Sequence, residues 1–238
     1  MADYPARLHV DYSEKLCRVS TFFRGIITIP VGIISGPLIW GIGALNNYSL
    51  SAPVFIMIAV LFGIIMPFIP SAGRGGIPAW FPYLYLAYVP MYLILSPLVM
   101  MLLFRKKYPR FWFDWAAGVT QFIYRVWAFQ FLLSDKYPST DEEQYMHITI
   151  DYPDAGKDLS RGLPLIKWIM AIPHYIVLGF LGTAAWIVSI IAWFAILFTG
   201  SYPRGLFDFV AGYLRWSLRV WTYVLLLATD KYPPFSLD

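Results

Sequence analysis

The chain has 238 residues, of which 59% are hydrophobic, 19% aromatic and only 13% charged, and its formal net charge is +4. Ordinary globular domains contain roughly 45–50% apolar and about 25% charged residues, so the composition argues against a water-soluble protein and predicts a polytopic membrane protein. Because the few cationic residues fall mainly in loops beside apolar segments, the net charge gives no indication of nucleic-acid binding.

The N-terminal segment begins Met-Ala-Asp-Tyr-Pro and has neither the basic region nor the apolar stretch of a cleaved signal peptide. Residues 7–12, Arg-Leu-His-Val-Asp-Tyr, alternate between polar and apolar side chains as a half-exposed strand does. Cys17 is the single cysteine, which excludes an intramolecular disulfide. Membrane insertion is therefore expected to depend on internal apolar segments.

Six apolar segments follow along the chain, and each approaches the roughly 20 residues that a transmembrane helix needs. The predicted transmembrane helices are residues 22–45, 52–69, 81–103, 114–133, 168–198 and 207–228. We interpret 168–198 as one long helix, because a hairpin within the uncharged stretch 168–203 would leave each half about a turn short. The helices at 114–133 and 207–228 each carry an arginine near the middle, so they either span the bilayer or lie at its interface.

The chain contains an internal repeat. Residues 104–133 align without gaps on residues 198–227, and 13 of the 30 pairs are identical, including a Tyr-Pro-Arg string. The match continues into an Asp-Lys-Tyr-Pro string that ends each half, and residues 8–12 resemble residues 148–152. We therefore predict two units, residues 1–138, with an inserted transmembrane helix at about 46–82, and residues 139–238.

These elements predict an all-α polytopic membrane protein with about six transmembrane helices in two parallel repeats. Residues 7–12 and 145–152 are expected to pair as a small two-stranded β element at the membrane surface. Parallel pairing would suit equivalent repeats, although the sequence does not decide it. An even number of helices in each half places both termini on one side, and the loop charges favour the cytoplasm. The cluster Arg105-Lys-Lys argues for the opposite orientation.

Three strings in the second half carry a resemblance to a known family. They are Trp193 to Phe209, Leu214 to Tyr223 and Asp230 to Phe235. They resemble a bacterial membrane family catalogued as domain of unknown function 4389, whose motif often occurs twice in one chain. The first half departs from it, with Phe111-Trp112 in place of Gly-Leu, Gln121 in place of Arg215, and the inserted helix. The resemblance implies a bacterial plasma membrane protein and supplies no activity.

A polar stripe runs along the last predicted helix of each half. Its members share the spacing four, three and four, which places them on one helical face. They are Asp114, Gly118, Gln121 and Arg125 in the first half, and Asp208, Gly212, Arg215 and Arg219 in the second. An arginine at the bilayer centre costs about 2.5–3.5 kcal/mol on insertion scales, so these side chains need a partner or water.

Three interpretations of the stripes remain open. In the first, the stripes line a cleft in which Arg125, Arg215 and Arg219 bind an anion or a lipid headgroup. In the second, the arginines cap backbone carbonyls or pair with an aspartate of the other repeat. In the third, they extend to the membrane interface. The two structural interpretations together are favoured.

Two further sets of polar residues have weaker functional interpretations. Arg110 and Arg204 can bind phosphate, although an i,i+4 pair with Asp114 or Asp208 is favoured. His9 and His147 can meet beside Asp11 and Asp151 if the strands pair, forming a metal site, although exposed strand histidines are usually solvated polar residues. We predict no cofactor.

The sequence therefore favours a non-enzymatic integral membrane protein, an accessory or scaffold subunit of a larger assembly. Its expected partners are the lipid bilayer and other membrane subunits or a second copy of the chain. The alternative is a channel, transporter or lipid- or anion-binding membrane protein that uses the arginine stripe. A membrane enzyme ranks third, because the sequence contains no recognisable catalytic motif.

Overall fold

The structure, a computed structural model, describes residues 4–13, 16–24, 26–28, 30, 98–140 and 144–238. Its elements are β1 (Ala6–Val10), the π-helical turn η2 (Met101–Arg105), α4 (Arg110–Gln130), β2 (Met146–Ile150), α5 (Leu163–Met170), α6 (Ile172–Thr199) and α7 (Arg204–Val224). Residues 18–24 are also helical, and we call them the 18–24 helix. The predicted helix at 52–69, the insertion at 46–82 and most of the helices predicted at 22–45 and 81–103 lie outside the described residues.

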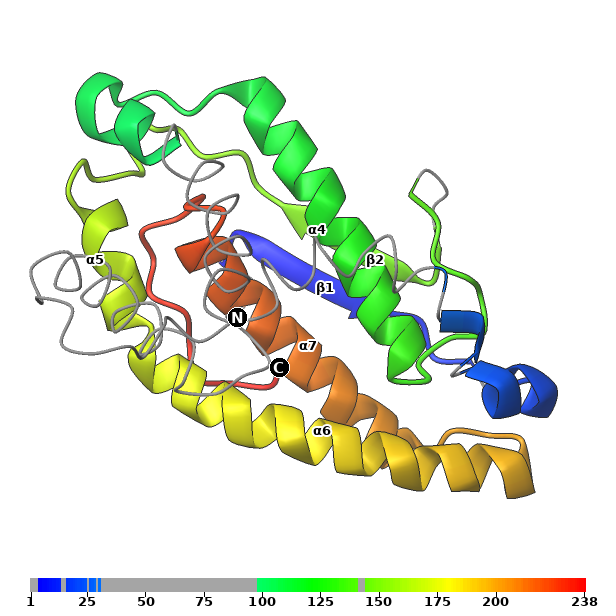
Figure 1. The fold of residues 1–238 in the computed structure, drawn as a ribbon. Helices are drawn as coiled ribbons and strands as arrows, with labels where there is room; N and C mark the ends of the chain where they lie inside the picture. Colours follow the sequence, from blue (N-terminus) through cyan, green and yellow to red (C-terminus); the bar gives the residue numbers. More distant parts are fainter. Residues whose placement is uncertain (1–3, 14–15, 25, 29, 31–97, 141–143) are drawn as a thin grey trace, which may run out of the picture.

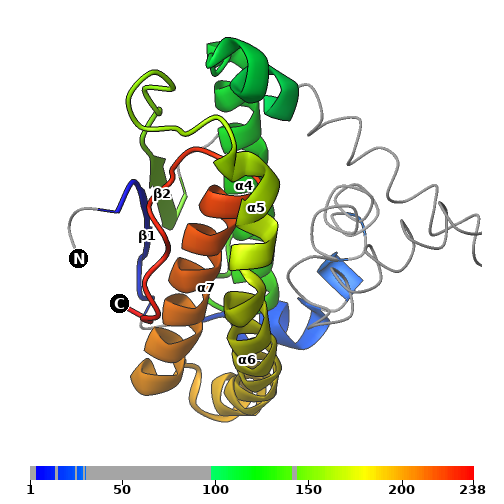
Figure 2. The same cartoon turned by 90° about the vertical axis from the view of Figure 1, so that its left-hand side faces the viewer.

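The elements are arranged around α7 (Figure 1). One face of α7 packs on α6 and another packs on β1, while α4 packs on β2. Figure 2 shows the sheet on one flank of the molecule and the 18–24 helix on the other, with α4 and α7 between them. As a result α7 is buried along most of its length, including the side chains of Tyr213, Trp216 and Arg219.

Proline and left-handed residues set the ends of the helices. Pro109 and Pro203 precede α4 and α7 with extended backbone, at ψ 129° and 125°, and a proline there loses no helical hydrogen bond because it has no N–H. The preceding helical segments end at Lys106 and Gly200, whose φ angles of 51° and 79° are left-handed. The Tyr-Pro-Arg strings of the sequence are thus sharp corners between two helices.

The predicted two-stranded element is present, but its strands are antiparallel. The register places His9 opposite His147 and Leu8 opposite Ile148. Leu8 and Ile148 are also equivalent in the sequence alignment of the two halves. A twofold rotation makes equivalent strands antiparallel, whereas parallel pairing requires them to be related largely by translation. The structure thus decides the strand direction that the sequence left open.

The predicted fold of six transmembrane helices is wrong. Within the described ranges, α6 alone is long and apolar enough to cross a membrane, judged by length and composition. The predicted spans 114–133 and 207–228 are the helices α4 and α7, but buried polar and aromatic side chains pack these helices against protein. An apolar face that meets another part of the chain has the same composition as one that meets lipid, and hydropathy does not distinguish them.

The segment predicted at 168–198 contains one long helix and no hairpin. A break at Ala171 separates α5 from α6, and Pro173 follows in the first turn of α6. From Tyr175 onward, the buried residues of α6 recur every three or four positions along a single stripe. The buried residues of α6 are His174, Tyr175, Leu178, Gly182, Ala185, Ser189, Ala192 and Ile196. The other faces of α6 are covered far less by the described protein.

Candidate functional site

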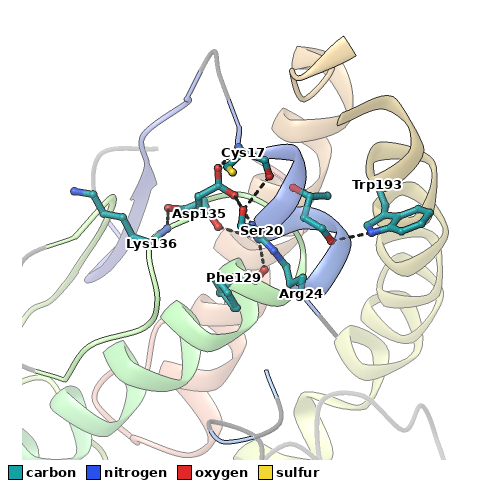
Figure 3. A network of polar contacts seen from close by, with 9 residues as sticks. Cys17, Ser20, Arg24, Phe129, Asp135, Lys136 and Trp193 are labelled. Carbon is teal, nitrogen blue, oxygen red and sulfur yellow. Dashed lines mark hydrogen bonds and ion pairs between the residues drawn. The ribbon is translucent and has the colours of Figure 1, made fainter. Parts of the chain in front are cut away.

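A buried arginine joins the 18–24 helix to the end of α4 (Figure 3). The guanidinium of Arg24 lies 2.6 Å from a carboxylate oxygen of Asp135, and its side chain is 5% exposed. It also donates to the carbonyls of Phe129 and Ser134 at 2.7 and 2.9 Å and lies 4.4 Å from the centre of the Phe129 ring. We call this arrangement the first clamp.

Asp135 also caps the 18–24 helix. One carboxylate oxygen accepts from the backbone N–H of Cys17, and the other accepts from the hydroxyl of Ser20 at 2.9 Å. The unpaired N–H groups at a helix start favour a negative charge in this position. In the first clamp one carboxylate therefore both pairs with a buried cation and caps a helix terminus.

The second half contains a corresponding arrangement, which we call the second clamp. The ammonium of Lys167 lies 2.8 Å from Asp230 and donates to the carbonyl of Thr229 at 2.6 Å. It lies 5.0 Å from the centre of the Tyr223 ring, and Asp230 accepts from the backbone N–H of Ser160. Burial lowers the pKa of Lys167, and the carboxylate of Asp230 opposes this effect.

The predicted site residues do not include the charged residues of the two clamps, although the sequence contains a signal for them. Arg24 and Lys167 are the last charged residues before two long uncharged stretches, which begin at Gly25 and Trp168. The aspartates belong to the two Asp-Lys-Tyr-Pro strings, one at the end of each half. The sequence does not indicate which cation pairs with which aspartate, because more than 60 residues separate each cation from its carboxylate.

Two tyrosines link the halves across the sheet. The hydroxyl of Tyr12 donates to the carbonyl of Tyr202 at 2.6 Å, and the hydroxyl of Tyr152 donates to the carbonyl of Tyr108. The guanidinium groups of the predicted site residues Arg110 and Arg204 lie over these rings: Arg110 is 5.6 Å from Tyr152 and Arg204 is 5.2 Å from Tyr12. In the described structure neither arginine forms an ion pair with the aspartate four residues later, Asp114 or Asp208.

The arginines of the polar stripes bind the chain itself. Arg125 donates to the carbonyl of Ser139 at 2.8 Å. Arg219 donates to the main-chain oxygens of Ser236 and Asp238 at 2.8 and 2.6 Å, and Arg215 donates to that of Leu237 at 3.1 Å. These contacts fasten the segment after each helix onto that helix.

The remaining residues of the stripes are less tightly held. Gln121 lies 3.4 Å from the carbonyl of Ile148, while Asp114 and Asp208 are exposed. All three arginines donate to main-chain oxygens of the chain itself, but the buried Nε of Arg125 has no hydrogen-bond partner in the described part of the chain. Binding of an anion or a lipid headgroup by the stripe therefore stays a prediction.

The two predicted metal ligands lie side by side on the exposed face of the sheet. His9 and His147 each place Nε2 3.4 Å from a different carboxylate oxygen of Asp11, whereas Asp151 lies 3.9 Å from Arg7. Across the residues that the structure describes, no group of three histidine, cysteine or acidic residues is arranged to hold a metal ion. A metal at this pair stays a prediction.

Many large apolar side chains are exposed on three helical segments of the molecule. We refer to the exposed apolar side chains of these three segments together as the apolar side. They are Val19, Phe22, Phe23 and Ile26; Leu165, Ile166, Trp168, Ile169 and Met170 of α5; and Phe180, Trp186, Ile187, Ile190, Ile191, Phe194 and Phe198 of α6. A pocket of about 520 Å³ opens between α6 and Arg24 and is lined mainly by aromatic and aliphatic side chains.

Comparison with known proteins finds a family match within the second half of the chain. Residues 164–236 match the family model described as Domain of unknown function (DUF4389). No curated protein and no solved structure matches the chain. The matched segment contains α6, α7, the arginines Arg215 and Arg219, and both charged groups of the second clamp. The resemblance inferred from the sequence is confirmed for this segment.

Proposed function

We propose that the protein is a non-enzymatic membrane protein that acts as a scaffold or accessory subunit of a larger assembly. In this proposal its apolar side contacts lipid and its two-stranded sheet faces water. The exposure of so many large apolar side chains on these helices, beside strands whose exposed residues are polar, is the observation that carries the proposal. Monomeric soluble proteins rarely expose contiguous apolar patches larger than a few hundred Å², and transfer of one large apolar side chain out of water is worth about 1.5–3 kcal/mol.

The contacts of the buried charges support a scaffold role. Arg24, Lys167, Arg125 and Arg219 each bind carbonyls of the chain, and two of them also pair with an aspartate. Their guanidinium and ammonium groups thus hold different segments of the chain in fixed positions. A rigid water-facing surface above a membrane anchor is the arrangement that docking of another subunit requires.

We further propose that the chain consists of two copies of one unit, residues 1–138 and 139–238. The recurrence of the clamp and of the tyrosine link at matched positions supports this division. The two ends of the described chain, β1 and residue 238, lie on the sheet flank (Figure 2), which supports placing both termini on one side of the membrane. From the loop charges we assign that side to the cytoplasm. From the family resemblance we assign the protein to a bacterial plasma membrane.

Membrane association is tested with charges introduced on the apolar side. Ile187 and Ile191 are 56% and 52% exposed and lie one helical turn apart, so Ile187→Lys/Ile191→Lys should leave the fold intact. Each lysine costs about 2.5–3.5 kcal/mol at the centre of a bilayer, and the variant should leave the membrane fraction. Thr140→Lys/Thr149→Lys adds the same charge at exposed positions of the connector and the sheet, and should stay membrane-bound.

The scaffold role is tested by isolating the full chain from native membranes under mild extraction. We expect a partner protein at fixed stoichiometry, and we expect less of this partner when Thr149 in the sheet is replaced by a bulky residue. A chain that is recovered alone and migrates as a monomer would contradict the scaffold role, while its membrane association would still be judged by the lysine variants.

A further inference from the structure

The two corners between helices differ in charge. In the aligned repeat, the corner before α4 reads Arg105-Lys106-Lys107, whereas the corner before α7 reads Thr199-Gly200-Ser201. Both have a left-handed residue in the middle, Lys106 with φ 51° and Gly200 with φ 79°. A glycine adopts this conformation without strain and a lysine does not. The two corners therefore have similar backbones, but the three residues of the corner before α4 are all cations and the three of the corner before α7 are all uncharged.

A second loop adds to the charge beside Lys106. The ammonium of Lys106 donates to the carbonyl of Gly156 at 2.7 Å, which holds the corner against the loop between β2 and α5. That loop contributes Lys157 and Arg161, and we call these five residues the basic end: Arg105, Lys106, Lys107, Lys157 and Arg161. Two acidic groups are also present, Asp154, which lies 3.8 Å from Lys157, and Asp158, which accepts from the backbone N–H of Asp154. The cations outnumber them.

The basic end borders the apolar side. Phe104 immediately precedes the corner and is 76% exposed, and Leu165 in the first turn of α5 is 53% exposed. Figures 1 and 2 both place η2 and the loop before α5 at one end of the molecule, with the corner between α6 and α7 at the other. At that other end Arg18 donates to the carbonyl of Phe198 and Arg204 lies over Tyr12.

We propose that the basic end binds the headgroups of anionic phospholipids, and so fixes which end of the protein contacts the charged surface of a bilayer. This inference rests on the proposed contact of the apolar side with lipid. Clustered lysine and arginine side chains beside a membrane-embedded segment are attracted to anionic lipids, within about a Debye length of the surface. Arg105 and Lys107 are exposed at the basic end and can reach a phosphate while Phe104 remains in hydrocarbon.

The repeat supplies the variant that tests this proposal. Arg105→Thr/Lys106→Gly/Lys107→Ser converts the basic corner into the sequence that the other corner already has, and glycine suits the left-handed position. The charge-matched control is Arg7→Thr/Lys136→Ser/Lys231→Ser, which removes three cations elsewhere. The full chain is diluted from neutral detergent into vesicles of phosphatidylcholine alone or with about one third phosphatidylserine, and the bound fraction is measured by flotation.

We expect the unmodified chain to bind both vesicles and to favour the anionic ones by at least about tenfold at low salt. The corner variant should lose most of this preference and keep its binding to phosphatidylcholine, while the charge-matched control should keep the preference. An unmodified chain that binds both vesicles equally, or a control that loses as much as the corner variant, overturns the basic end as a headgroup site. Failure to bind either vesicle overturns the proposed function instead.

Inorganic phosphate separates a headgroup from a free anion. At equal ionic strength, phosphate and chloride should reduce binding to the anionic vesicles equally, because both screen a charged surface. A loss of binding that is selective for phosphate identifies a free-phosphate site and overturns the assignment to lipid.

Discussion

At the scale of single residues, the first clamp is the contact whose loss we expect to be most costly. Asp135→Ala removes the carboxylate from a guanidinium that is 5% exposed and from the start of the 18–24 helix. Removing one partner of a buried ion pair typically destabilises a protein by about 3–5 kcal/mol. We expect the free energy of unfolding, measured with denaturant in detergent, to fall by about 3 kcal/mol.

Lys136→Ala is the neighbouring control for this prediction. Lys136 is exposed, and surface substitutions of this kind usually change stability by less than about 0.5 kcal/mol. Asp230→Ala should repeat the effect of Asp135→Ala in the second clamp. A change below about 1 kcal/mol in Asp135→Ala would show that Arg24 is sufficiently stabilised by the carbonyls of Phe129 and Ser134 alone.

At the scale of elements, the equivalent helices α4 and α7 differ in what covers their glycines. A Cβ atom on Gly212 of α7 would lie 2.8 Å from the main-chain oxygen of Leu237, whereas a Cβ on Gly118 of α4 meets nothing within 4 Å. Leu237 belongs to the segment that Arg215 and Arg219 hold against α7. Close approach of this segment to α7 thus requires glycine at 212.

Gly118→Ala and Gly212→Ala are therefore expected to act in opposite directions. Alanine in a helix interior is favoured over glycine by about 0.5–1 kcal/mol, so Gly118→Ala should raise the free energy of unfolding. Gly212→Ala should lower it and expose residues 234–238 to a carboxypeptidase or to hydrogen exchange. Equal effects of the two variants would indicate that residues 234–238 do not pack on α7 in solution.

At the scale of the whole molecule, buried tyrosines join segments that are far apart in sequence. The hydroxyls of Tyr4, Tyr108 and Tyr145 donate to the carbonyls of Arg219, Leu226 and Arg125. Burial raises the pKa of each of these tyrosines above the ordinary value of 10.0. The fold therefore depends on phenol groups that stay protonated.

These tyrosines predict a loss of stability in alkali. Above pH 10 they ionise in the unfolded chain and remain protonated in the folded one, so the folded state binds more protons and stability falls as the pH rises. The pKa of Lys167 is lowered in the folded protein, which makes stability rise with pH. This opposing effect ends near pH 10.5, the ordinary pKa of lysine, because the side chain is then deprotonated in the unfolded chain as well. The denaturation midpoint should fall with pH above this value.

Tyr108→Phe is the matched variant, since it removes one titrating group and keeps the ring. It should be less stable near neutral pH, through loss of one hydrogen bond, and its midpoint should fall less steeply with pH in alkali. A midpoint in the unmodified chain that does not change above pH 10.5 would contradict the role of the buried tyrosines.

The sequence by itself determined the local features of this protein. The alternating residues 7–12 and 145–152 predicted two paired strands, the Tyr-Pro-Arg strings became the corners before α4 and α7, and the family strings of the second half were matched over residues 164–236. These features depend on neighbouring residues, such as a proline without an N–H or a strict alternation of apolar positions.

Only the tertiary structure decided which apolar faces meet protein and which remain exposed. The α7 segment resembled a membrane span, yet it is buried between α6 and β1, and the two aspartates of the repeat found their cations far away in the chain. The physical reason is that burial removes apolar surface from water equally well against lipid or against another part of the chain. The pairing of Arg24 with Asp135 and of Lys167 with Asp230 likewise depends on distances that the fold creates.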